Sequence, residues 1–175
     1  MKPRRLNVKI AIPLVGEISG EWEPDEAESK AAWELYVELI TRVAVVGLSD
    51  DQGSLREAMT SIYSLFAITR DILRRYGPQV APSAKEGQIS FGSLAVTVLN
   101  GSLRPFLTTW HPRLSSWEAT RPLDRAPVDH ERAWSLESEA RRDLTQVRGV
   151  LAETAKALGR VSGAADLVRL DVTNS

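Results

Sequence analysis

One line of side chains in the last third of the chain constrains the fold more than any other feature. Its members recur at near-heptad spacing and are Glu137, Ala140, Leu144, Val147, Leu151, Thr154 and Leu158, with Trp134 at the start. This period predicts a helix over 129–162, capped by Asp129 and roughly 45 Å long at about 1.5 Å per residue. A helix of this length needs a partner of similar length or another chain, so we expect a helical bundle and self-association through this helix.

Two further helices are predicted before it. The first, over 24–48, begins at a proline followed by acidic residues, which fit the first turn and the positive end of the helix dipole. The second, over 50–76, follows a Ser-x-x-Gln capping box at Ser49 and ends before a glycine and a proline. The short connection between them favours an antiparallel helical hairpin.

The segment 91–119 fits two structures. Residues before its Asn-Gly pair have strand composition, and the pair itself favours a hairpin turn, which leaves 94–103 open between hairpin and helix. Apolar residues nevertheless keep helical spacing across the pair. We therefore predict a helix over 91–119 with a kink near Gly101 or Pro105.

The N-terminal segment 1–20 is expected to be extended, because apolar residues alternate with more polar ones at Leu6, Val8, Ile10 and Ile12. A second extended piece with a turn at Ser19-Gly20 would make a small hairpin. Residues 164–175 form a tail. The whole chain, 1–175, is thus predicted to be one mainly α domain, an antiparallel four-helix bundle with a short N-terminal extended segment or hairpin.

Composition narrows the chemistry open to this domain. The 175 residues include two histidines but no cysteine. The absence of cysteine excludes disulfides, thiol catalysis and cysteine metal sites. With 22 Lys and Arg against 23 Asp and Glu, the net charge of -1 disfavours nucleic-acid binding by bulk electrostatics. No apolar run approaches the ~20 residues of a membrane span. We expect a cytoplasmic protein that uses no metal and no cofactor.

The densest group of chemically useful residue types lies at 103–113 and includes Arg104 and His111. Their spacing resembles the Arg-to-His motif of the HEPN ribonucleases, a resemblance that implies a pair at a dimer cleft that promotes metal-independent RNA cleavage. Seven residues at about 100° each return to nearly the same helix face, so both side chains could point into one cleft. The structural interpretation is that Arg104 extends along the bundle edge while His111 caps the next turn before Pro112.

Other cations and aromatic residues indicate two candidate surfaces. The predicted anion-binding set consists of Arg70, Arg74, Arg104 and Arg113. Trp33 and Trp134 fit the predicted core, whereas Trp22, Trp110 and Trp117 fall at helix ends, where they cap the bundle or contact a partner. The predicted interface set consists of Trp110, Trp117, Leu144, Val147 and Leu151.

These patterns favour a non-catalytic helical-bundle module that acts by protein–protein interaction or oligomerisation within a larger assembly. One alternative is a HEPN-like, metal-independent ribonuclease that uses Arg104 and His111, and nucleic acid is a partner only in that case. Another is a sensor domain that binds a small molecule or an anion near Arg104. Function follows from a site rather than from a fold, so the geometry around Arg104 separates these hypotheses.

Overall fold

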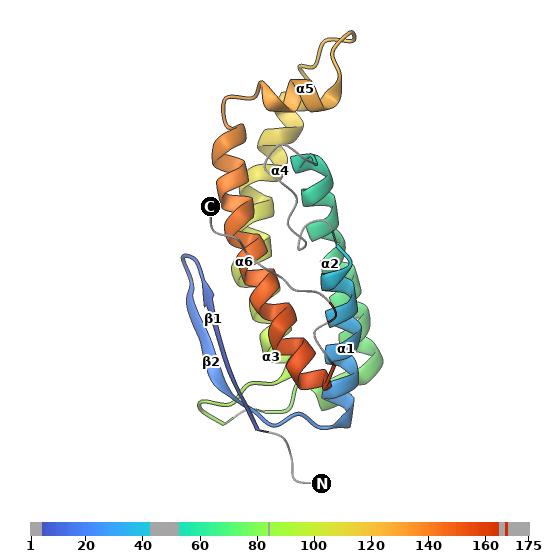
Figure 1. Cartoon of the computed structure of the whole chain (residues 1–175), viewed down its shortest axis with the longest axis vertical. Coiled ribbons are helices and arrows are strands. Elements are labelled where there is room, and N and C mark those ends of the chain that lie inside the picture. The colour runs from blue at the N-terminus through green and yellow to red at the C-terminus, as the bar shows by residue number, and fades with distance from the viewer. Residues whose placement is uncertain (1–4, 43–52, 84, 165–166, 168–175) are drawn as a thin grey trace.

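The computed structural model describes residues 5–42, 53–83, 85–164 and 167, and it is mainly helical with a two-stranded antiparallel hairpin at the N-terminus (Figure 1). This confirms the predicted mainly α class and the N-terminal hairpin. The helices are α1 (Glu26–Ile40), α2 (Leu55–Tyr76), α3 (Phe91–Val98), α4 (Arg104–Glu118), α5 (Pro127–Arg132) and α6 (Glu137–Ser162), with a 3-10 turn at Gly77–Val80 and a π-helical turn at Leu99–Leu103.

The hairpin pairs β1 (Leu6–Ile12) with β2 (Gly16–Trp22) and packs β1 against α6. The alternation predicted for β1 is confirmed, because Val8, Ile10 and Ile12 are buried. The turn expected at Ser19-Gly20 was wrong. The chain reverses at 13–15, where Leu14 has φ 70° and Gly16 has φ 122°, conformations that close a tight turn.

The first two helices are shorter than predicted. α1 begins after the Asp25 cap but ends at Ile40, not at 48, and residues 43–52 lie outside the described part of the chain. α2 begins at Leu55, not at 50, because the Ser54 side chain accepts the backbone N–H of Glu57 and so caps the helix there. The Ser49 capping box lies outside the described residues.

The ambiguous segment is helical, as predicted, and contains no hairpin. α3 continues through the π-helical turn into α4, and the backbone N–H of Arg104 donates to Leu99, five residues back. Pro105 explains this wide turn, because its ring would press on the Gly101 carbonyl in a regular helix and its nitrogen has no proton to donate. The predicted weak point near Gly101 or Pro105 is therefore a π turn.

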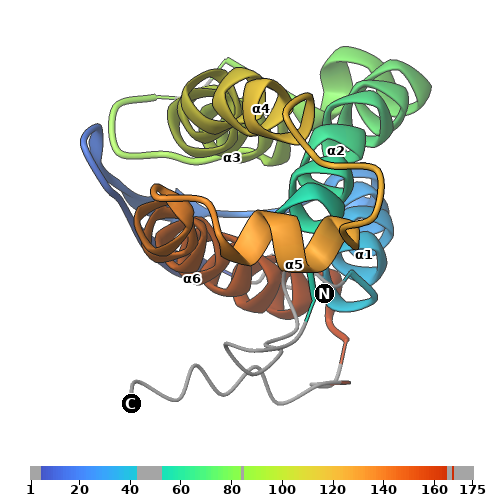
Figure 2. The same ribbon diagram turned by 90° about the horizontal axis from the view of Figure 1, so that it is seen from above.

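The single helix predicted over 129–162 is wrong, because the structure divides it into α5 and α6. α5 begins at Pro127, with Asp129 in its first turn rather than at the cap. Residues 133–136 break the helix, and Trp134 is buried there with its ring edge-on to that of Trp110 at a centroid distance of 6.0 Å. α5 consequently crosses the ends of the long helices (Figure 2).

The core lies between the long helices, with contacts between α1 and α2, α1 and α6, α2 and α4, and α4 and α6. A regular four-helix bundle is not confirmed by these contacts. Trp33, expected in the core, is 43% exposed on α1, whereas Trp22 and Trp134 are buried. Most of the predicted tail, at 165–166 and 168–175, lies outside the described residues.

Candidate functional site

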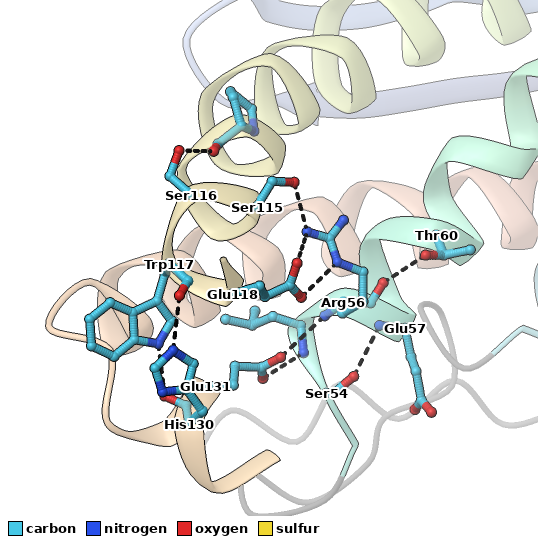
Figure 3. Close-up of polar contacts among 12 residues, drawn as sticks. Ser54, Arg56, Glu57, Thr60, Ser115, Ser116, Trp117, Glu118, His130 and Glu131 are labelled. Carbon is cyan, nitrogen blue, oxygen red and sulfur yellow. Dashed lines mark hydrogen bonds and ion pairs between the residues drawn. The ribbon is translucent and has the colours of Figure 1, made fainter. Parts of the chain in front are cut away.

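A polar cluster at one end of the molecule fixes the register of α2 against α4 (Figure 3). The Arg56 guanidinium on α2 bonds both carboxylate oxygens of Glu118 on α4, at 2.9 and 2.7 Å, and reaches the Ser115 hydroxyl at 3.1 Å. A two-point contact of this kind restricts the rotation and translation of the two helices. It makes α2 and α4 antiparallel neighbours, since the start of one meets the end of the other.

The same end is closed by α5. The Glu131 carboxylate accepts the backbone N–H groups of Leu55 and Arg56, at 2.8 and 3.4 Å, and so caps the start of α2 from a distant part of the chain (Figure 3). His130 stacks on Trp117 at a centroid distance of 4.4 Å, and its Nε2 donates to the Trp117 carbonyl. These contacts attach α5 to the start of α2 and to the end of α4.

The candidate site is a groove between α2 and α4 with a volume of about 440 Å³. Spacings of three and four residues place the α2 contributors on one helix face, and the same spacings do so on α4. The lining residues are Tyr63, Phe66 and Arg70 from α2, and Arg104, Leu107, Thr108, His111 and Pro112 from α4.

Two arginines supply positive charge to this groove. The Arg104 guanidinium lies over the Phe66 ring, 5.1 Å from its centroid, and its Nε donates to Asn100 Oδ1 at 3.1 Å. Arg70 donates through Nε to the Phe66 carbonyl at 3.1 Å. Within the described parts of the chain, neither arginine forms an ion pair with a carboxylate. The groove therefore carries positive charge that the described residues do not neutralise.

His111 lies inside α4 and caps no helix, so the structural interpretation of His111 as a cap was wrong. It is exposed and lines the groove one α-helical repeat of seven residues beyond Arg104. The sequence-based expectation that the two side chains share a helix face is met, because the π turn ends before Arg104 and the helix between the pair is regular.

The other two members of the predicted anion-binding set lie elsewhere. Arg74 is exposed at the end of α2 with Asp71 4.0 Å away, and it does not line the groove. Arg113 lies over the Trp110 ring at 5.3 Å from its centroid, on a different side of α4. Only Arg70 and Arg104 of the set are brought together.

The predicted interface residues are mostly internal. Leu144, Val147 and Leu151 are buried in the chain's own core, and Trp110 is buried with its Nε1 donating to Asp143 at 3.0 Å. Trp117 is half-buried and donates to the His130 carbonyl at 2.8 Å. The stripe on α6 thus packs within the chain.

Five groove residues were not predicted as site residues: Tyr63, Phe66, Leu107, Thr108 and Pro112. Tyr63, Phe66 and Arg70 follow one another at intervals of three and four, so the helical period contained a signal. Their proximity to Arg104 depended on the register of two helices, which no local pattern encodes.

Comparisons with models of protein families, with curated proteins and with solved structures found no match. Among the described residues, no group of three or more His, Asp or Glu side chains is placed to hold a metal ion. No helix in the described ranges is both long and apolar enough to cross a membrane. The function is therefore inferred from the groove itself.

Proposed function

We propose that this chain is a binding module for an anionic ligand and that the groove between α2 and α4 is its binding site. One observation carries the proposal: Arg70, Arg104 and His111 line a groove of about 440 Å³, and no carboxylate among the described residues forms an ion pair with either arginine. Other surface arginines of the chain, such as Arg56 and Arg75, are paired with carboxylates. Arginines left unpaired in a concave site suit phosphate or carboxylate groups, which their planar forks bind through two hydrogen bonds.

The test uses pyrophosphate as the probe, titrated into the purified protein by calorimetry at low ionic strength. We expect binding that weakens as salt rises, because the attraction is partly screened. Arg70→Gln and Arg104→Gln should each reduce the affinity about tenfold, the effect of losing one charged hydrogen bond. Arg74→Gln is the matched control, since it removes the same charge one turn beyond Arg70 and outside the groove. Equal losses in all three variants would contradict the site.

Metal-independent RNA cleavage is a second candidate function, favoured by the shared groove of Arg104 and His111. In this mechanism His111 transfers a proton and Arg104 stabilises the charge on the phosphate. Purified protein would then cleave single-stranded RNA in the presence of a chelator. His111→Asn and Arg104→Gln should each abolish cleavage without lowering the melting temperature, whereas Arg113→Gln should cleave normally. Absence of cleavage by the wild-type protein rejects this candidate.

Protein interaction or oligomerisation in a cytoplasmic assembly is a separate proposal, supported by the exposed apolar side chains of Leu14 and Val15 at the hairpin tip. Sedimentation of the wild-type protein and of Leu14→Ser at several concentrations tests it, because only an interface at the tip makes the two differ.

The antiparallel four-helix bundle also remains a proposal. The closed ring of contacts from α1 to α2, α4, α6 and back supports it.

A further inference from the structure

The groove is chemically different at its two ends. The Arg56–Glu118 pair and the stacking of Arg104 on Phe66 fix the antiparallel register of α2 and α4. In that register Arg70 lies at the same end as Arg104, and Tyr63 lies at the end of His111. Seven residues separate Tyr63 from Arg70 along one face of α2, a rise of roughly 10 Å. A cationic end is thus joined to an aromatic end by the Phe66 ring.

Tyr63 is the aromatic residue available to a ligand. Its side chain is 67% exposed, whereas Phe66 is half-buried and one of its faces is covered by the Arg104 guanidinium. The Tyr63 ring lies 6.3 Å from the Phe66 centroid, tilted by 42°, so Phe66 supports it from one side. An exposed ring of this kind, fixed on a helix, offers a flat surface on which a planar group can stack.

We infer that the ligand of this groove is a free mononucleotide, with its phosphate between Arg70 and Arg104 and its base stacked on Tyr63. This inference rests on the proposed anion-binding function and names the ligand class. A bare phosphate leaves the aromatic end unused, and an uncharged aromatic molecule leaves the arginines unused. A nucleotide carries both groups on one molecule and contacts both ends of the groove.

A nucleic-acid strand fits the charge distribution less well than a single nucleotide. A strand that passes over Tyr63 needs a second phosphate site on the side away from Arg70. The cation found there is Arg56, seven residues before Tyr63, and its guanidinium is already bonded to Glu118 and Ser115. The Glu118 carboxylate neutralises this guanidinium, so the pair offers a phosphate no net positive charge. The described groove therefore has one phosphate site beside one stacking surface.

The base should be bound with little selectivity. Two lining residues carry hydroxyl groups: Tyr63 supplies the stacking surface, and Thr108 donates its proton to the carbonyl of Arg104 at 2.9 Å. Among the lining side chains this leaves the His111 ring and the hydroxyl of Tyr63 itself as the polar groups at this end of the groove. Stacking accepts every base, so purine and pyrimidine nucleotides should bind alike except for the larger stacking area of the purine.

The experiment compares three probes by calorimetry: AMP, ribose 5-phosphate and pyrophosphate. We expect AMP to bind roughly tenfold more tightly than ribose 5-phosphate, because only AMP carries a base. Tyr63→Ala should remove this advantage and leave the affinity for ribose 5-phosphate unchanged, whereas Tyr63→Phe should preserve it. Trp33→Ala is the matched control, because it removes another exposed aromatic ring outside the groove.

Each outcome decides a different point. Equal affinities for AMP and ribose 5-phosphate overturn the nucleotide inference while the anion-binding function stands. If none of the three probes binds, the anion-binding function fails and the nucleotide inference fails with it. A single-stranded RNA hexamer that binds more tightly than AMP overturns the inference in favour of a strand-binding groove, and AMP binding at least as tightly as the hexamer supports it.

Discussion

Glu28 connects three parts of the fold through one buried carboxylate. Its Oε1 accepts hydrogen bonds from Trp22 Nε1 at 3.0 Å and from the backbone of Phe91 at 2.9 Å. Glu28→Ala leaves these donors buried without an acceptor, so we expect the free energy of unfolding to fall by about 2–4 kcal/mol. Urea denaturation measures this. Glu28→Gln, which keeps an acceptor oxygen, should lose less, and Glu26→Ala, on the exposed face of the same turn, should change the midpoint little.

Glu28 also makes stability depend on pH. Burial raises the pKa of its carboxyl above the ordinary value of 4.5, although the hydrogen bonds from Phe91, Asp25 and Trp22 act in the opposite direction. The folded state then holds the proton more tightly than the unfolded chain does. Between 4.5 and the raised pKa, increasing the pH therefore lowers the free energy of unfolding. Glu28→Gln should lack this pH dependence. If the free energies of unfolding of wild type and Glu28→Gln differ by a constant amount across this pH range, the pH dependence does not come from Glu28.

At the scale of elements, the outer edge of β2 is covered by the loop before α3. The backbone N–H of Glu21 donates to the Gly87 carbonyl at 2.9 Å, and the Glu21 carbonyl accepts the backbone N–H of Ile89 at 2.8 Å. A Cβ on Gly20 would lie 2.5 Å from that Gly87 oxygen. Because the clash is with backbone, Gly20→Ala should displace the loop and cost about 1–3 kcal/mol in the free energy of unfolding.

Gly149 provides the contrasting substitution. It lies in the middle of α6, and a Cβ there would meet nothing within 4 Å. Gly149→Ala should therefore stabilise the protein by about 0.5–1 kcal/mol, since alanine favours the helix. Chemical denaturation of both glycine variants checks the two predictions. A Gly20→Ala protein with the wild-type free energy of unfolding would contradict the close approach of Gly20 to the Gly87 carbonyl.

The contact of α5 with the start of α2 depends on Glu131. Glu131→Ala removes the acceptor of the Leu55 and Arg56 amides, so these two amides should exchange with solvent faster and the free energy of unfolding should fall by about 1–3 kcal/mol. Hydrogen exchange read by NMR measures the local effect. Glu139→Ala, an exposed acidic residue on α6, is the control. Unchanged exchange at Leu55 would show that α5 does not cap α2.

At the scale of the whole molecule, the α6 stripe determines whether stability depends on association. Leu151 is 1% exposed within the single chain, so Leu151→Ala should cost about 2–5 kcal/mol through loss of packing and creation of a cavity. The thermal midpoints of wild type and variant should both be independent of protein concentration. A midpoint that rises with concentration in wild type and equally in Leu14→Ser would instead place the stripe at an interface between chains, because Leu14→Ser removes the alternative interface at the hairpin tip.

The candidate site divides into a part that the sequence could provide and a part that it could not. Arg104 and His111 lie on one regular helix, so the helical period alone predicted that they share a face. Arg70 and Tyr63 belong to another helix, and their approach to Arg104 depends on the Arg56–Glu118 contact between residues 62 positions apart. A contact between residues this far apart in the chain leaves no local pattern in the sequence.

Periodicity determined the helical class, the alternation of β1 and the helical state of 91–119, because each depends on neighbours within a few residues. Only the tertiary structure decided where the helix predicted over 129–162 breaks. The burial of Trp134 against Trp110 and the cap that Glu131 gives to α2 stabilise a turn at 133–136 that the heptad spacing did not indicate. The stripe from Ala140 to Leu158 stays on α6, which packs against α1 and α4, so the helix predicted to need another chain contributes to the protein's own core.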